Sequence, residues 1–134
     1  MDILEEEVPE KYFLSEKLQR ELSGKLPDWA KTGIYFVDLC IASPKITKIA
    51  RCLQARYFKR TGRPREASGV IIDGRIRRLT PRECFRLQGF LDELFDRAQA
   101  VNSDSQLYKQ AGNSVTVPVI RAIAEKIRES EILK

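Results

Sequence analysis

The chain has 134 residues, a net charge of +5 and no histidine. This length suits one small domain with a thin core, and the 43% hydrophobic and 32% charged residues exclude a disordered tail. Without histidine, Ser-His-Asp and Cys-His catalysis are excluded. Three widely spaced cysteines indicate a reducing compartment and leave no zinc ligand set. No apolar run reaches the roughly 20 residues that span a bilayer, so we expect neither a metal nor a membrane as partner.

Positive charge is concentrated in the middle of the chain. Residues 45–86 contain 13 Lys or Arg against 3 Asp or Glu, whereas residues 1–44 contain 5 against 9 and residues 87–134 contain 6 against 7. A band this basic predicts a surface that faces a polyanion such as nucleic acid. A solvated basic face is the alternative that charge alone leaves open.

The first half of the chain predicts short elements. After an acidic, extended lead-in over residues 1–14, Ser15 is placed to cap a short helix that Gly24 and Pro27 end. The run from Ile34 to Val37 favours a strand. Residues 45–69 fit neither a helical nor a strand period, so we expect irregular strand and loop there.

Stronger local signals follow. Residues 69–79 favour a β-hairpin with Asp73-Gly74 as its two-residue turn. The run Thr80-Pro81-Arg82-Glu83 is a capping box with proline at the first helical position. Gly89 is placed to end that helix, with Phe90 packing back on it.

The C-terminal part predicts two further helices. Residues 91–102 form a charged connection that allows helical turns, and Ser103 to Gln106 is a second capping box, for a short helix ending at Gly112. A last helix begins between Ser114 and Val117 and ends near Ser130. Its apolar stripe consists of Ile120, Ile123, Ala124 and Ile127.

Two blocks carry a family resemblance. Arg77 to Phe90 (RRLTPRECFRLQGF) resembles the ninth conserved motif of the DNA (cytosine-5) methyltransferases, and Tyr108 to Ile120 (YKQAGNSVTVPVI) resembles the tenth. The lead-in from Leu4 to Ser15 is similar to the segment that opens the target-recognition domain of small bacterial members. The resemblance covers almost the whole chain and is specific for the two C-terminal motifs.

The resemblance implies a two-lobed enzyme. In that family, a Rossmann-like lobe holds S-adenosyl-methionine and a catalytic cysteine, and a smaller lobe reads DNA. The base is flipped out of the duplex, the cysteine attacks C6, and C5 takes the methyl group. The helix of the tenth motif returns to the large lobe and closes the cofactor site.

The chain departs from this plan at the chemistry. It has no Phe-x-Gly-x-Gly cofactor loop, no Pro-Cys nucleophile and no Glu-Asn-Val motif. Catalytic residues are therefore assigned to none of its positions, and Cys84, in mid-helix, is expected to be a small buried hydrophobe. We expect the C-terminal part of a methyltransferase that is not competent alone, either an excised piece or one subunit of a split enzyme.

The resemblance implies one edge of a cofactor site. Short polar residues before a helix suit polar or anionic ligand groups, because the first N–H groups of a helix are free. In the family these positions line the S-adenosyl-methionine pocket; the alternative is that Asn113 or Ser114 only caps the helix. The candidate cofactor residues are Gly112, Asn113, Ser114 and Val115.

DNA contacts are expected from the basic band. Arginine can bind guanine edges or phosphates, and glutamine can bind adenine. Arg82 and Arg86 lie one turn apart; the alternative to DNA contact is that they hold the small lobe together. The nearest match to the family's Thr-Leu pair is Cys52-Leu53, so Cys52 is given no role. The candidate DNA-binding residues are Arg51, Gln54, Arg56, Lys59, Arg60, Arg63, Arg65 and Arg82.

Together these patterns predict an α+β chain. Residues 1–102 form a small, irregular, β-containing DNA-recognition region with the ninth-motif helix at about residues 80–89. Residues 103–134 carry the tenth motif and a C-terminal helix that would pack on an absent Rossmann-like catalytic lobe. The expected partners are double-stranded DNA and that lobe, in a bacterial cytoplasm at the nucleoid and in a restriction-modification setting. A non-enzymatic basic DNA-binding module, or an adaptor, is the alternative.

Overall fold

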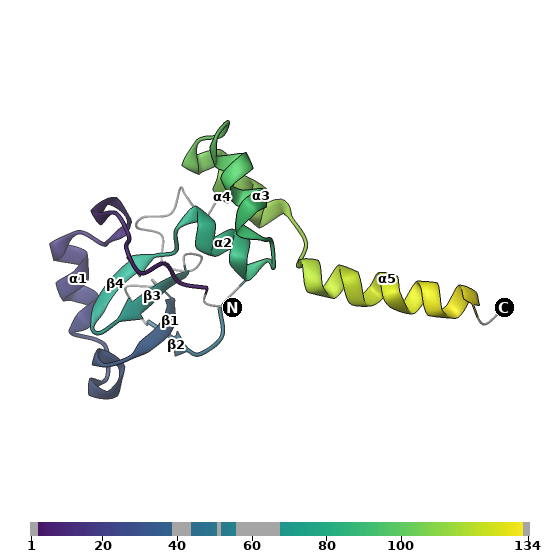
Figure 1. The fold of residues 1–134 in the computed structure, drawn as a ribbon. Helices are drawn as coiled ribbons and strands as arrows, with labels where there is room; N and C mark the ends of the chain where they lie inside the picture. The colour runs from purple at the N-terminus through teal and green to yellow at the C-terminus, as the bar shows by residue number, and fades with distance from the viewer. Residues whose placement is uncertain (1–2, 39–43, 51, 56–67, 133–134) are drawn as a thin grey trace.

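The computed structural model describes residues 3–38, 44–50, 52–55 and 68–132 (Figure 1). The elements of these ranges are, in chain order, the short 3-10 helix η1 (Glu10–Tyr12), α1 (Glu16–Ser23), the 3-10 helix η2 (Asp28–Lys31), β1 (Ile34–Asp38), β2 (Ile46–Thr47), β3 (Ser68–Ile72), β4 (Arg75–Arg78), α2 (Pro81–Leu87), α3 (Asp92–Gln99), α4 (Asp104–Asn113) and α5 (Val117–Ile132). A small sheet with helices around it is the α+β fold that the sequence predicts.

The four strands form one antiparallel sheet in the order β2-β1-β3-β4. β3 and β4 are the predicted hairpin. Its turn residues Asp73 and Gly74 both have positive φ, 47° and 80°, as a two-residue turn that follows the strand twist requires. The predicted strand at Ile34 is confirmed as β1, and β2 is a two-residue strand in the stretch expected to be irregular.

Both faces of the sheet are covered. On one face, Val37, Ile71 and Ile76 pack with Leu22 and Leu26, which lie in α1 and just after it. The opposite face belongs to a larger core that α2, α3 and α4 complete. Alternate residues of β3 supply the two cores, because successive side chains of a strand point to opposite faces. The larger core consists of Leu53, Val70, Leu79, Cys84, Phe85, Phe95, Leu107, Tyr108 and Ala111.

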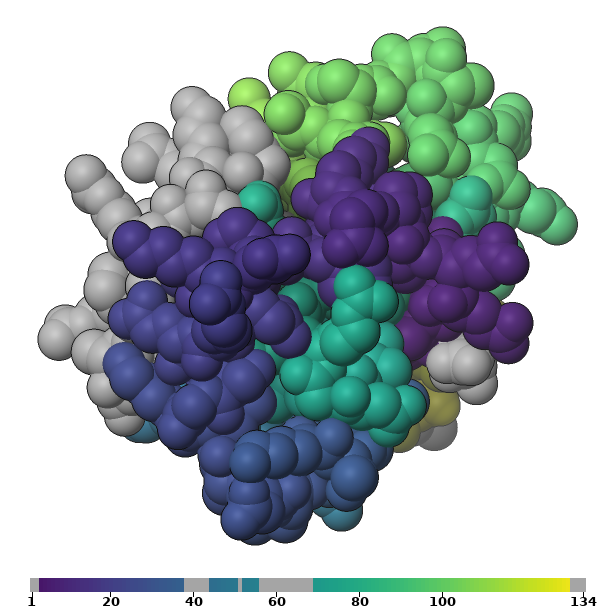
Figure 2. All heavy atoms as spheres, turned by 90° about the vertical axis from the view of Figure 1, so that its left-hand side faces the viewer, coloured from purple at the N-terminus to yellow at the C-terminus, as the bar shows by residue number. Residues whose placement is uncertain are grey.

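The N-terminal segment lies along the hairpin and the helices, where Figure 2 shows it between β4 and the α3–α4 region. Phe13 pairs with Arg77 in an isolated bridge, and Leu14 N donates to the carbonyl of Ile76. Just before these residues, Lys11 Nζ and Tyr12 Oη donate hydrogen bonds to the Asp104 carboxylate, at 2.7 and 2.8 Å. This segment therefore ties the sheet to α4, the first helix of the C-terminal part.

Two local predictions need correction and one is confirmed. The predicted capping box at Ser103 is wrong: Ser103 is the N-cap of α4 but makes no side-chain cap hydrogen bond. The helical turns that the charged connection allowed are present as α3, whose Phe95 is buried in the larger core. The last two helices also extend past their expected ends, to Asn113 and Ile132.

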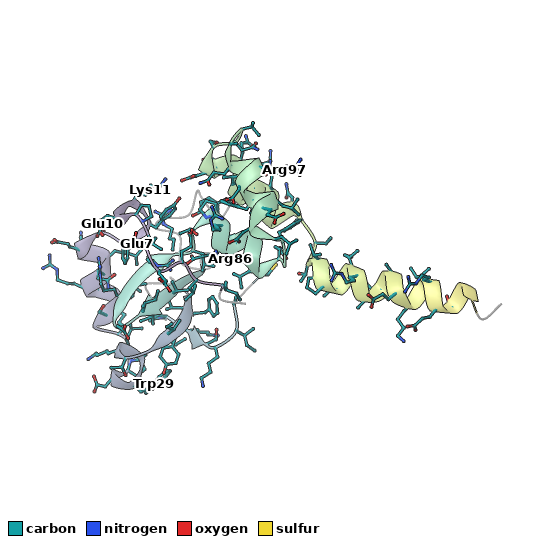
Figure 3. All side chains as sticks on the ribbon, viewed as in Figure 1. Glu7, Glu10, Lys11, Trp29, Arg86 and Arg97 are labelled. Atoms are coloured by element: carbon teal, nitrogen blue, oxygen red, sulfur yellow. The ribbon has the colours of Figure 1, made fainter. Side chains whose placement is uncertain are left out.

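The helix α5 stands apart from the rest of the molecule (Figures 1 and 3). Every residue from Pro118 to Ser130 is exposed, including the stripe residues Ile120, Ile123 and Ile127 at 45–55%. A helix with an apolar stripe normally buries it. Among the described helices, none is long and apolar enough to cross a membrane.

Candidate functional site

The ninth-motif helix α2 has both of its predicted end signals. At its start, Thr80 Oγ1 accepts from Glu83 N at 3.2 Å, and the Glu83 carboxylate accepts from Thr80 N at 2.8 Å. At its end, Gly89 has φ 82°, and the Phe90 N–H reaches back to the Phe85 carbonyl. The rings of Phe85 and Phe90 lie 5.4 Å apart. The capping box and the glycine end are therefore confirmed.

A buried ion pair fixes α2 to the sheet. Arg77, in β4, donates to both carboxylate oxygens of Glu83 at 2.7 and 2.8 Å, and the two side chains are 1% and 0% exposed. Glu5 N donates to the same carboxylate at 2.9 Å, in addition to Thr80 N. The Glu83 carboxylate thus accepts hydrogen bonds from four N–H groups, which offset the cost of burying it.

The two arginines of α2 that were candidates for DNA contact lie among acids. Arg82 lies 3.2 Å from Glu5, 3.6 Å from Asp92 and 2.6 Å from Asp96. Arg86, labelled in Figure 3, donates to both oxygens of Asp92 at 2.6 and 2.8 Å. This hydrogen-bonded contact raises the pKa of Arg86 and lowers the pKa of Asp92. These contacts join α2 to α3 and to the N-terminal segment, in line with the alternative, structural reading of the two residues.

The basic band is therefore less available than its net charge suggests. Of its seven described cations, four form ion pairs with carboxylates of this chain: Arg75, Arg77, Arg82 and Arg86. Six of the candidate DNA-binding residues, namely Arg51, Arg56, Lys59, Arg60, Arg63 and Arg65, lie outside the described residues. Gln54 is described, and its side chain is exposed.

Gln88, at the end of α2, holds the turn of the tenth motif from both sides. Its Nε2 donates to the Ala111 carbonyl at 3.0 Å, and its Oε1 accepts from Thr116 Oγ1 at 2.9 Å. Its backbone carbonyl accepts from Val117 N at 2.8 Å. The segment between α4 and α5 is thus fixed at Ala111 and again at Thr116 and Val117.

Within this turn, the four candidate cofactor residues differ in surroundings. Ser114 Oγ donates to the Ala111 carbonyl at 2.8 Å, so its hydroxyl proton is engaged inside the turn. Asn113 is exposed, and Val115 is 60% exposed beside it. An exposed amide next to an exposed apolar side chain fits the mixed polar and apolar character of an adenosyl group.

The first N–H groups of α5 are not all free, in contrast to the general expectation for a helix start. Val117 N donates to Gln88, Pro118 has no N–H, and Val119 N donates to the carbonyl of Thr116. The N–H groups of Val117 and Val119 are therefore engaged within the chain. The role of the four candidate residues at a cofactor stays a prediction.

Two glycines allow close packing around the turn. A Cβ on Gly89 would lie 2.5 Å from Pro118 Cδ, so this glycine admits the first turn of α5. A Cβ on Gly112 would overlap the Gln54–Ala55 peptide and lie 2.6 Å from Ala55 Cα. Gly112 therefore faces protein backbone on that side, and the structure brings it together with the candidate DNA-reading residue Gln54.

An apolar groove runs between α3 and α5. It has a volume of about 450 Å³, and its lining is mainly apolar with two charged residues on the α5 side: Gly89, Phe90, Leu91, Leu94, Val117, Pro118, Arg121, Ala122 and Glu125. Leu91 and Leu94 are themselves 60% and 46% exposed. The α5 residues of this groove lie on another face of the helix than the exposed stripe, because none of the stripe residues lines it.

The sequence did not predict the structural roles of three residues that hold α2 and the turn after α4 in place. Gln88 could have been singled out as the polar residue just before the helix-ending glycine. No local signal marks Glu5, which meets Glu83 from 78 positions away. Arg77 was grouped with the basic band. However, Ile76 and Arg77 are neighbours in a strand, so their side chains point to opposite faces of the sheet.

Comparison with known proteins identifies the family. Residues 4–129 match the family model of the C-5 cytosine-specific DNA methylases. The type II methyltransferase M.SsoII of Shigella sonnei is 40% identical over 94% of this chain and 31% of its own length. M.NlaX of Neisseria lactamica is 38% identical over 95% of the chain and 38% of its own length. M.DsaV of Dactylococcopsis salina is 36% identical over 94% and 33%, respectively. The chain thus spans about a third of the length of these curated relatives, and it belongs to the C-5 cytosine-specific DNA methylase family.

Proposed function

We propose that the chain is the DNA-recognising part of a DNA (cytosine-5) methyltransferase and supplies one edge of its S-adenosyl-methionine site. It acts with a catalytic lobe, carried by the same polypeptide or by a second subunit, and is inactive without it. The names of the type II relatives support a role in bacterial restriction-modification, with chromosomal DNA in the cytoplasm as the target.

One observation carries this proposal: the apolar stripe of α5 is exposed along its length. Fully burying one isoleucine side chain contributes about 1.5–3 kcal/mol. Because the three isoleucines of the stripe are 45–55% exposed, roughly half of this free energy per side chain is still to be gained. A lobe docked on this face would gain it. The turn that holds Asn113 and Val115 lies at the start of the same helix, so a docked lobe would lie beside that turn.

The cofactor edge is assigned to the side chains of the turn. Asn113 would hydrogen-bond a polar group of S-adenosyl-methionine, and Val115 would cover an apolar part of it. Gly112 and Ser114 would keep the turn in shape, through close packing and through the hydroxyl contact to Ala111. When bound, S-adenosyl-methionine supplies the methyl group. The chemistry at the cytosine belongs to residues of the catalytic lobe.

Double-stranded DNA is the proposed partner of the basic band. Gln54 would read a base edge, and Lys59 with the arginines at 51, 56, 60, 63 and 65 would contact bases and phosphates. Arg82 stays in this set, but its contribution is expected to be the smallest. It would have to exchange Glu5, Asp92 and Asp96 for phosphate, and these carboxylates already neutralise it.

Complementation tests the proposal. The chain and the cognate catalytic lobe are mixed with duplex DNA and S-adenosyl-methionine that is radiolabelled in its methyl group. We expect label in DNA cytosine only when both proteins are present. Ile123→Glu, on the stripe of α5, should lower the rate at least tenfold, because it places a charge in the apolar contact. Arg128→Glu, off the stripe, is the matched control and should change it little.

The outcomes separate the candidate functions. No methyl transfer with a well-folded cognate lobe contradicts the proposal. Sequence-selective DNA binding without any transfer or lobe binding would instead favour the non-enzymatic DNA-binding module.

A further inference from the structure

Gly112, in the tenth motif, packs against the Gln54–Ala55 peptide of the recognition region. The three atoms nearest to a Cβ at position 112 would all be backbone atoms, so moving a flexible side chain would not relieve the overlap. Gly112 lies in α4, in helical conformation, which any residue can adopt. Its lack of a side chain therefore serves the contact, since no special φ requires it.

Neighbouring residues hold this peptide against α4. Leu53 is 9% exposed and belongs to the same core as Ala111, which precedes Gly112. The next residue, Gln54, turns its side chain out to solvent. The buried Leu53 side chain and the contact with Gly112 together restrict how far this peptide can move towards or away from α4. The direction in which the Gln54 amide leaves the surface is set by the same two contacts.

The other side of the contact is equally fixed. Gln88 holds the Ala111 carbonyl and the Thr116 hydroxyl, so the end of α4 cannot move without breaking these hydrogen bonds. The Gln54–Ala55 peptide therefore rests on a support that the ninth-motif helix keeps in place. A bidentate amide contact to adenine needs both hydrogen bonds in line, so an error of about 1 Å in this support would spoil it.

We propose that Gly112 is a positioning residue for DNA sequence recognition: by admitting the Gln54–Ala55 peptide against α4, it aims the Gln54 side chain at a base edge. This inference rests on the proposed function, in that the chain must read DNA. It gives the tenth-motif glycine a role in specificity that is separate from any role at the cofactor.

The test measures discrimination separately from affinity. A preferred 20-bp duplex is selected with the wild-type chain from a randomised pool, and binding to it and to a scrambled duplex is measured by fluorescence anisotropy at several salt concentrations. Gly112→Ala should lower the preference for the selected duplex about tenfold, towards the value of Gln54→Ala. Affinity for the scrambled duplex, and its salt dependence, should stay unchanged, because the phosphate-binding cations are untouched.

Two glycine variants serve as controls. Gly24→Ala places a Cβ 3.4 Å from the Arg20 carbonyl, an ordinary contact, and should behave as wild type. Gly33→Ala strains a residue with φ 91° beside Tyr35, which packs on the core of Leu22 and Ile71. It should lower stability while the preference between duplexes is kept. A loss of preference that merely follows stability, in Gly33→Ala as in Gly112→Ala, would overturn the inference.

The outcomes separate the two ideas. A wild-type chain without any preference among duplexes would refute the proposed function and this inference with it. A wild-type preference that a folded Gly112→Ala variant retains would overturn the inference alone. Should Gly112→Ala fail to fold, hydrogen exchange on the wild-type chain decides. The selected duplex should protect the amides of Leu53 to Ala55 and of Ala111 to Asn113 together, and protection of the first group alone would overturn the inference.

Discussion

The helices α2 and α5 carry the two recognised motifs and are built in opposite ways. α2 has a capped start, a glycine end, a buried ion pair and a place in the larger core. α5 begins at an equally well-fixed turn and then exposes its apolar stripe to solvent. The difference teaches that the chain buries one motif helix in its own core and leaves the apolar stripe of the other exposed. We propose that α2 serves the fold of its own lobe and that the exposed face of α5 serves the assembly of two lobes.

The buried pair gives the largest expected effect. Arg77→Ala leaves the Glu83 carboxylate buried without its cation, which should lower the free energy of unfolding by about 3–5 kcal/mol. Urea unfolding followed by circular dichroism measures it. Arg20→Ala, which breaks an exposed pair at 3.9 Å, is the matched control and should change stability by less than about 0.5 kcal/mol. Equal losses of stability in the two variants would contradict the claim that the buried pair fixes α2 to the sheet.

The two N-caps offer a sharper comparison of intermediate size. Thr80→Ala removes a cap hydrogen bond and should cost about 1 kcal/mol, within the usual range for such caps. Ser103→Ala removes a side chain that makes no cap bond, so it should cost less than half as much. The same urea titration measures both variants. A larger loss for Ser103→Ala would show that α4 depends on its cap in solution.

The contact between the N-terminal segment and α4 predicts a small pH effect. The hydrogen bond from Lys11 lowers the pKa of Asp104, while burial raises the pKa of Tyr12 to about 12. A lowered carboxyl pKa contributes stability that is complete above the ordinary value of 3.8 and lost as the pH falls through the folded-state value. Since the Asp104 side chain is 40% exposed, we expect less than about 1 kcal/mol. Unfolding curves of Asp104→Asn and the wild-type chain between pH 2 and 6 should converge at the acid end, and parallel curves would contradict the assignment.

Local sequence signals predicted those parts of the fold that local physics controls. The Asp73-Gly74 turn, the Thr80 capping box and the Gly89 end are each decided by a few neighbouring residues, and all three are confirmed. The burial of Cys84 is confirmed as well; burial also raises the pKa of its thiol. These features share short range, which is why a single sequence could show them.

Contacts between distant positions were beyond the sequence. The acidic partners of Arg82 come from the N-terminal segment and from α3, so no local pattern could distinguish a paired arginine from a free one. The close approach of Gly112 to Ala55 joins segments 57 positions apart. Its glycine suggested a helix end and a ligand contact, whereas the packing needs it for a neighbouring peptide. The cofactor and DNA roles of these residues stay predictions.

The unfolding free energy of Ile123→Ala in the chain alone tests the central claim most directly, with Leu107→Ala as the buried reference. We expect Ile123→Ala to change stability by less than about 0.5 kcal/mol, because Ile123 is 51% exposed. Leu107→Ala, at 0% exposure in the larger core, should cost about 2–5 kcal/mol. A loss of 2 kcal/mol or more for Ile123→Ala would mean that the chain buries its own last helix, and it would contradict the claim that this face is kept for a partner.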